Sequence, residues 1–133
     1  MTLKLLRIVL IIIFVVSVLF FLVWLKDYNL RKDNDKIRSD LLKETPIGMS
    51  FDKVTSKLES MNLETEPSNT GFHKQERASS EIIGVRSIRV FLGEYREVRA
   101  FPYLFLTTVD ALWGFDEDGK LIEIWIWKTT DGF

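Results

Sequence analysis

The sequence predicts an α+β protein: an N-terminal transmembrane helix, one or two further helices, and then a three- to four-stranded antiparallel sheet. Three observations predict this class. A long apolar run lies near the N-terminus, segments with helical spacing of apolar residues come after it, and the second half alternates apolar and polar residues with a period of two. We therefore divide the chain into an anchor at 1–25, a juxtamembrane helix or stalk at 26–45, and a small α+β domain at 46–133.

The anchor is the eighteen-residue run from Ile8 to Leu25, in which Ser17 is the one polar side chain. As a helix it would be about 27 Å long, close to the roughly 30 Å hydrocarbon thickness of a bilayer. A cleaved signal peptide usually has a shorter apolar region and a small-residue cleavage site, and a pilin-like shaft carries a Gly-Phe processing site and a Glu. We therefore expect an uncleaved single-pass anchor in the lipid bilayer.

The orientation of this anchor is predicted by two opposing signals. A first span at the extreme N-terminus normally exports the chain after it, which places the C-terminal domain outside the cytoplasmic (inner) membrane. The Lys and Arg residues after the span outnumber those before it, which favours a cytoplasmic domain by the positive-inside rule. We favour the extracytoplasmic domain, and the absence of cysteine fits either compartment.

Two helices are expected after the anchor. In 26–45, apolar residues recur at about helical spacing, and Pro46 ends the pattern. This helix is either a solvated stalk or a helix that packs on the domain or on a partner. The second helix begins at Ser50, a good N-cap, with Met49 and Val54 at the positions of a hydrophobic staple.

The strands are expected after residue 80. Residues 64–80 contain Pro67, Asn69 and Gly71 and are typical of a turn and loop, in which the Asn69-Thr70-Gly71 portion is also suited to join short strands. A half-buried strand is expected to end at Gly93, with a charged connection at 94–99 and then a long strand at 103–115. After a turn at Gly119, the last strand covers 120–128. Its two expected faces are Ile122, Ile124 and Ile126 on one side, and Leu121, Trp125 and Trp127 on the other.

The start of the second helix carries a resemblance to a known family. Gly48-Met49-Ser50-Phe51-Asp52-Lys53-Val54, with Leu58 after it, resembles the Gly-Met-Thr-x-x-x-Val…Leu helix start of the BamE-like (SmpA/OmlA) small envelope lipoproteins, which assist outer-membrane barrel assembly. The same start occurs in β-lactamase-inhibitor-protein repeats. The resemblance implies a helix pair and then a three-stranded antiparallel sheet, in an extracytoplasmic protein-binding module. Those lipoproteins carry an acylated Cys, whereas this chain has no Cys and has an apolar span instead.

Few residues suit catalysis or metal binding. With one His and no Cys, a zinc site would need carboxylates for nearly all its ligands. His73 is expected as an exposed loop residue rather than as a catalytic base. The acidic run at 116–118 matches no calcium-loop pattern and is expected as a solvated hairpin tip. We therefore expect no cofactor, no metal and no enzymatic activity.

The charge balance also argues against nucleic acid. All 19 acidic residues come after the anchor, so the remaining chain is slightly acidic, whereas phosphate binding needs a basic face. Within this chain, 82–100 is locally basic and 110–123 is acidic. We interpret these stretches as paired within one sheet, or else as two charged patches. Asp110 is either a buried acid paired with an arginine such as Arg89, or it faces water.

The aromatic residues are the strongest binding feature. Trp113, Trp125 and Trp127, with Tyr103 and Phe105, either fill the core or form an exposed platform. Trp, Tyr and Arg are typical anchors of protein interfaces. The candidate partner-binding residues are Arg89, Arg96, Tyr103, Trp125 and Trp127.

The predicted function is a membrane-anchored, non-enzymatic protein-binding module of the bacterial cell envelope, serving as an assembly or accessory factor. The partner is expected to be a protein whose identity the sequence does not give. A homodimer is one arrangement that would cover the second apolar face of the last strand. The alternatives are a membrane-held, toxin-neutralising inhibitor or immunity protein, and a small hydrolase or ligand-binding domain.

Overall fold

The computed structural model describes residues 2–76, 79–100 and 103–132, and it describes their side chains except at 26, 27, 76, 98–100, 103 and 132. The helices are α1 (Leu3–Arg31), α2 (Asn34–Glu44) and α3 (Phe51–Ser60). The strands are β1 (Thr65–Ser68), β2 (Phe72–Glu76), β3 (Ser79–Ile83), β4 (Arg86–Ala100), β5 (Tyr103–Phe115) and β6 (Leu121–Gly132). The predicted α+β class, with an N-terminal apolar helix and an antiparallel sheet, is confirmed.

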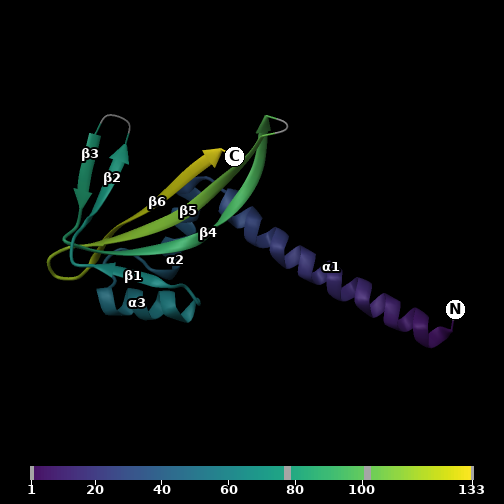
Figure 1. Cartoon of the computed structure of the whole chain (residues 1–133). Coiled ribbons are helices and arrows are strands. Elements are labelled where there is room, and N and C mark those ends of the chain that lie inside the picture. Colours follow the sequence, from purple (N-terminus) through teal and green to yellow (C-terminus); the bar gives the residue numbers. More distant parts are fainter. Residues whose placement is uncertain (1, 77–78, 101–102, 133) are drawn as a thin grey trace.

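Helix α1 projects away from the rest of the chain (Figure 1). It is long and apolar enough to cross a membrane, and none of its most apolar stretch is buried against other described residues. Its one polar side chain within the run, Ser17, donates a hydrogen bond from Oγ to the backbone oxygen of Ile13 at 2.8 Å. This bond satisfies the hydroxyl inside the helix, so the hydroxyl adds little cost in an apolar environment.

The chain after the anchor packs on the sheet. Helix α1 continues through Arg31, and α2 begins at Asn34 after a short break. Leu30 and Ile37 are each 7% exposed and belong to the core. The sequence left open whether 26–45 is a solvated stalk or a helix that packs on the domain or on a partner. The burial of Leu30 and Ile37 shows that it packs on the domain.

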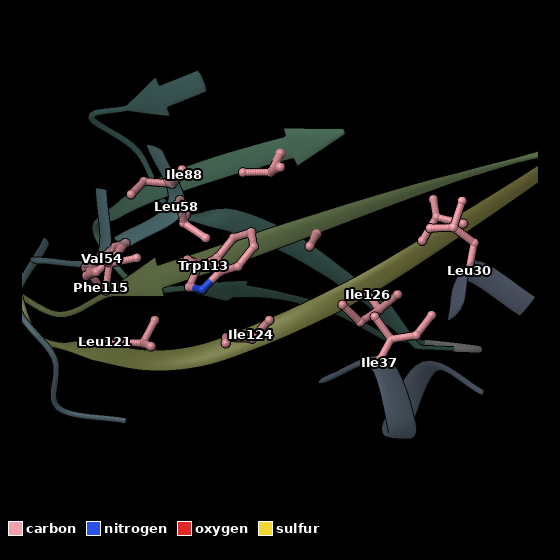
Figure 2. Close-up of a cluster of buried hydrophobic side chains, with 13 residues drawn as sticks. Leu30, Ile37, Val54, Leu58, Ile88, Trp113, Phe115, Leu121, Ile124 and Ile126 are labelled. Atoms are coloured by element: carbon pink, nitrogen blue, oxygen red, sulfur yellow. The ribbon is translucent and has the colours of Figure 1, made fainter. Parts of the chain in front are cut away.

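The main sheet is antiparallel, with the strand order β1-β4-β5-β6. Alternate residues of its strands face α2 and α3 and are fully or almost fully buried, because the side-chain period of a strand is two. The expected N-cap of α3 is confirmed, since Ser50 Oγ accepts a hydrogen bond from the backbone amide of Lys53 at 3.4 Å. Figure 2 shows Trp113 of β5 among Leu58 of α3 and Ile124 of β6.

Strand β4 is longer than the sequence predicted. The strand does not end at Gly93, and the charged connection expected at 94–99 is wrong, because β4 extends to Ala100. Phe91 pairs with Asp110 and Gly93 pairs with Val109, so Leu92 is an extra residue in a β-bulge. The bulge shifts the phase of the alternation by one residue, which hides the continuing strand from a periodicity argument.

The loop expected at 64–80 is wrong in part, and the alternative that 69–71 joins short strands is confirmed, because β1 ends at Ser68 and β2 begins at Phe72. Strand β1 pairs with β4 in the main sheet, and β2 and β3 form a separate two-stranded sheet. His73 therefore lies in β2 and not in a loop. Most side chains of these short strands are polar and exposed, so they lack the apolar alternation that marks a half-buried strand.

The two faces of β6 differ from the expected assignment. Phe115 pairs with Leu121 and Gly114 pairs with Glu123, which leaves Ile122 as a second bulge residue. Leu121 is fully buried and shares the core face with Ile124, whereas Ile122 is 42% exposed. The single extra residue exchanges the faces of Leu121 and Ile122.

Helix α2 covers the outer edge of β6. Asn34 Nδ2 donates to the backbone oxygen of Ile126 at 3.3 Å, and Arg38 Nε donates to that of Ile124 at 2.9 Å. Arg38 is itself held by an ion pair with Glu123, at 2.6 Å between Nη2 and Oε1. These side chains satisfy carbonyl groups that would otherwise be open to pairing with another strand.

Candidate functional site

The candidate site is the face of the main sheet that points away from α2 and α3, which we call the outer face. Its members alternate with the buried residues Val90, Ala111 and Ile126. Register places three rows across β4, β5 and β6. These rows are Arg89–Leu112–Trp125, Phe91–Asp110–Trp127 and Arg96–Leu106–Asp131.

Four of the five candidate residues are brought together on the outer face. Arg89 and Arg96 lie on it from β4, and Trp125 and Trp127 lie on it from β6. Arg96 and Trp127 are exposed, while Trp125 is half-buried. Tyr103 begins β5, but its side chain falls outside the described part of the structure.

The two tryptophans form part of a stack of rings. Trp125 and Trp127 have ring centroids 5.9 Å apart and planes inclined by 10°. Phe72 of β2 stacks on the other side of Trp125, with centroids 6.0 Å apart and an angle of 7°. Stacked aromatic pairs at such distances are favourable beyond their buried area. The β2–β3 hairpin thus holds Trp125 in place and leaves Trp127 43% exposed.

Phe72 is not among the residues that the sequence marks as candidates. It lies in the segment expected to be a loop, and its partner in the hairpin is Ile83. The signal that could have found it is a pair of apolar residues, Phe72 and Ile83, at the two ends of a polar stretch of hairpin length.

Trp113 does not belong to an exposed platform. It is fully buried on the core face of β5, and its Nε1 donates to Thr45 Oγ1 at 3.0 Å. Its residue number is odd within β5, whereas the outer-face residues of that strand, such as Asp110 and Leu112, have even numbers. Phe105 is in the odd row as well and is half-buried. The platform therefore consists of Trp125 and Trp127 and excludes Trp113.

An ion pair lies at the centre of the outer face. Arg89 Nη2 is 3.1 Å from Asp110 Oδ2, and the exposed fractions of these side chains are 50% and 9%. The prediction of an acid paired with an arginine such as Arg89 is confirmed. The basic and acidic stretches pair within one sheet in part, where 86–91 of β4 lies opposite 110–115 of β5. Asp110 lies between Phe91 and Trp127 on the neighbouring strands. Beside it is an open hollow of about 330 Å³, lined by Glu66, Arg89, Phe91, Thr108 and Asp110.

The described residues contain no group of three or more His, Cys, Asp or Glu placed to hold a metal ion. His73 is exposed, with Nδ1 3.4 Å from Ser80 Oγ. In the turn after β5, Asp116 Oδ1 accepts hydrogen bonds from the backbone amides of Asp118 and Lys120, as expected of a hairpin tip. The geometry of the outer face suits binding through rings and a guanidinium group.

Fold and site together define an α+β chain that combines one helix long enough to cross a membrane with an exposed aromatic sheet face. Comparison with protein-family models, with curated proteins and with solved structures finds no match for this chain. The resemblance of the helix start at 48–58 to BamE-like lipoproteins therefore stays a prediction.

Proposed function

We propose that this chain is a single-pass, membrane-anchored, non-enzymatic protein-binding module of the bacterial cell envelope, and that its outer face binds the partner. The observation that carries the proposal is the Trp125–Trp127 stack on an open sheet face. On the same face, Phe91 is 56% exposed and lies across Asp110 from Trp127. Exposed apolar side chains bordered by charged residues are typical of interaction sites.

The face of the sheet is favoured over its β6 edge as the binding surface. A partner strand that added to β6 near Ile124 and Ile126 would have to displace the side chains of Asn34 and Arg38. No such displacement is needed on the outer face, where Trp127 and Arg96 are already exposed. Aromatic and arginine side chains contribute the largest share of the binding free energy in most protein interfaces.

Replacing both Trp125 and Trp127 with alanine is expected to abolish co-purification of the partner while the chain remains folded. Trp127 is 43% exposed and Trp125 is half-buried, so neither fills the core beneath α3. The measurement is recovery of partner proteins after crosslinking in cells, with circular dichroism of the purified variant. Ile47→Ala is the matched control, because Ile47 is 54% exposed and lies outside the outer face. Unfolding of the double variant, or unchanged recovery, would contradict the proposal.

The anchor is proposed to be α1, with the N-terminus in the cytoplasm and the domain outside the cytoplasmic membrane. Support for the anchor comes from the unburied apolar surface of α1, which is unfavourable in water. Resemblance to envelope lipoproteins favours the same side.

Protease added to cells with a permeabilised outer envelope and an intact inner membrane is expected to digest the domain after α1. A cytoplasmic protein serves as the control for membrane integrity. Protection of the domain, together with digestion after lysis, would reverse the orientation and move the search for a partner to the cytoplasm.

A further inference from the structure

We propose that the outer face recognises a basic segment of its partner, and that a lysine side chain of this segment enters the hollow beside Asp110 and binds the carboxylate. This inference rests on the proposed function, because it names the chemistry of the partner at the same surface. It goes beyond that function by giving the hollow a role separate from that of the Trp125–Trp127 stack.

The hollow itself carries more negative than positive charge. Its charged lining residues are Glu66, Asp110 and Arg89, so carboxylates outnumber guanidinium groups. Glu66 of β1 is exposed and lies directly opposite Arg89 in the register of the sheet. An acidic group of a partner would therefore meet more repulsion than attraction in the hollow, whereas a cationic group would be attracted.

The wider outer face also has an excess of acids among its described side chains. Glu123 is left out of this balance, because Arg38 and Lys74 lie 2.6 Å and 3.8 Å from its carboxylate. Lys128 of β6 belongs to the opposite face, where its Nζ donates to the backbone oxygen of Lys32 at 2.6 Å. The remaining charged residues of the outer face are the acids Glu66, Glu94, Asp110 and Asp131 and the bases Arg89 and Arg96. A basic partner segment therefore complements the charge of this face.

The carboxylate of Asp110 has room for one further donor. Its Oδ2 accepts a hydrogen bond from Arg89 Nη2 at 3.1 Å, and the side chain is 9% exposed and lines the hollow. A carboxylate offers about four acceptor sites, so a single donor that enters the hollow can be added to this bond. Arginine binds a carboxylate best through both oxygens at once, whereas the ammonium group of lysine needs only one. The existing bond from Arg89 therefore favours a lysine in the partner.

Aromatic rings border Asp110 on both neighbouring strands. Phe91 of β4 and Trp127 of β6 are its register partners. Side chains directly opposite each other have Cβ atoms about 4.5–5.5 Å apart. A cation is attracted to the face of a ring within roughly 6 Å of the centroid. Phe91, which lines the hollow and is 56% exposed, is thus placed to contact the lysine, and Trp127 offers apolar surface to the residues beside it.

The size of the hollow suits one long side chain. Its volume of about 330 Å³ is near the lower end of the range for small-molecule sites, about 300–1,000 Å³. The stem of a lysine is apolar and can lie along Phe91 while the ammonium group reaches Asp110. A lysine that is part of a longer segment also places its neighbours on the open sheet face.

The experiment is a titration of the full chain, solubilised in a neutral detergent, with three acetylated heptapeptides that alternate serine with lysine, glutamine or glutamate. Binding is followed by NMR through the indole N–H signals. We expect the lysine peptide to shift the signal of Trp127 saturably and to leave the signal of the fully buried Trp113 unchanged. Its affinity should exceed that of the glutamine peptide about tenfold, and the glutamate peptide should not bind.

Variants of the full chain test the carboxylates and the ring. Asp110→Asn keeps the shape of the side chain and is expected to weaken binding of the lysine peptide about tenfold. Glu66→Gln, on an exposed side chain, should weaken it about twofold. Phe91→Leu keeps an apolar side chain without a ring and should weaken it about threefold. Glu117→Gln is the matched control, because Glu117 is exposed in the turn after β5, and it should leave binding unchanged.

The outcomes separate this inference from the proposed function. Equal affinity of the lysine and glutamine peptides overturns the lysine site, and this comparison needs no variant. Full affinity in Asp110→Asn, with an unchanged Trp113 signal as the sign of a folded chain, overturns the role of Asp110. Spermidine is the free-cation probe, and an affinity equal to that of the lysine peptide would overturn the role of a protein segment. In each of these cases, loss of partner recovery in the Trp125 and Trp127 double variant would still support the outer face as the binding surface.

Discussion

Replacing Trp113 with alanine is expected to lower the free energy of unfolding by about 4 kcal/mol, the usual cost of removing a large aromatic side chain from a core. Trp113 is fully buried between the sheet and the helices, and its Nε1 donates to Thr45 Oγ1 at 3.0 Å. The total stability of a domain is typically about 5–15 kcal/mol, so the variant should be partly unfolded at modest denaturant concentrations. Urea denaturation of the detergent-solubilised chain, monitored by circular dichroism, measures the change.

Trp127→Ala is the matched control, because Trp127 is 43% exposed on the opposite face of the sheet. Its expected cost is about 1 kcal/mol. Trp113→Phe separates packing from hydrogen bonding: it keeps a ring in the core and removes the donor to Thr45, whose hydroxyl still donates to the backbone oxygen of Leu41. Equal losses for Trp113→Ala and Trp127→Ala would show that the two faces have been assigned incorrectly.

Gly84→Ala is expected to cost about 3 kcal/mol or more, because two unfavourable effects act at the same position. Gly84 has a φ of +73°, and a Cβ atom there would lie 2.5 Å from the backbone oxygen of Phe115 and 2.8 Å from its nitrogen. These are backbone atoms of β5, and the oxygen also accepts from the amide of Val85 at 2.8 Å. The clash can be relieved only by moving the start of β4 away from β5.

Gly119→Ala isolates the contribution of the backbone conformation. Gly119 has a nearly identical φ of +71°, but no atom lies within 4 Å of its added Cβ. We expect a loss of about 1–2 kcal/mol there, from the left-handed conformation alone. The same urea titration compares the two variants, and equal losses would mean that the approach of Gly84 to Phe115 has no energetic weight.

Periodicity predicted the fold wherever a strand or helix keeps one phase. In β5, the odd residues Val109, Ala111 and Trp113 are all fully buried, as an uninterrupted alternation requires. The periodicity argument failed at Leu92 and Ile122, because one inserted residue exchanges the two faces of the strand after it. A bulge is defined by the pairing with the neighbouring strand. This pairing cannot be read from the sequence of one strand alone.

The site is predictable by residue type but not by position. Arg89, Arg96, Trp125 and Trp127 are candidates because such residues anchor interfaces, and register places them on one face. Residue type does not separate Trp113 from Trp127, because a tryptophan suits a core as well as an interface. That distinction is decided by the strand register.

The direct entry of α1 into the core has a mechanical consequence. Leu30 is buried with the core residues, and Arg31 stacks over the ring of Tyr95 on β4 at 4.7 Å. A flexible linker of n residues has a root-mean-square end-to-end distance of about 5–6 Å × √n, which would let the domain move relative to the helix. Here the packing of Leu30 and Arg31 on the domain makes α1 and the sheet rotate together. In a bilayer, the tilt and rotation of α1 would therefore set both the direction in which the Trp125–Trp127 stack faces and its height above the lipid.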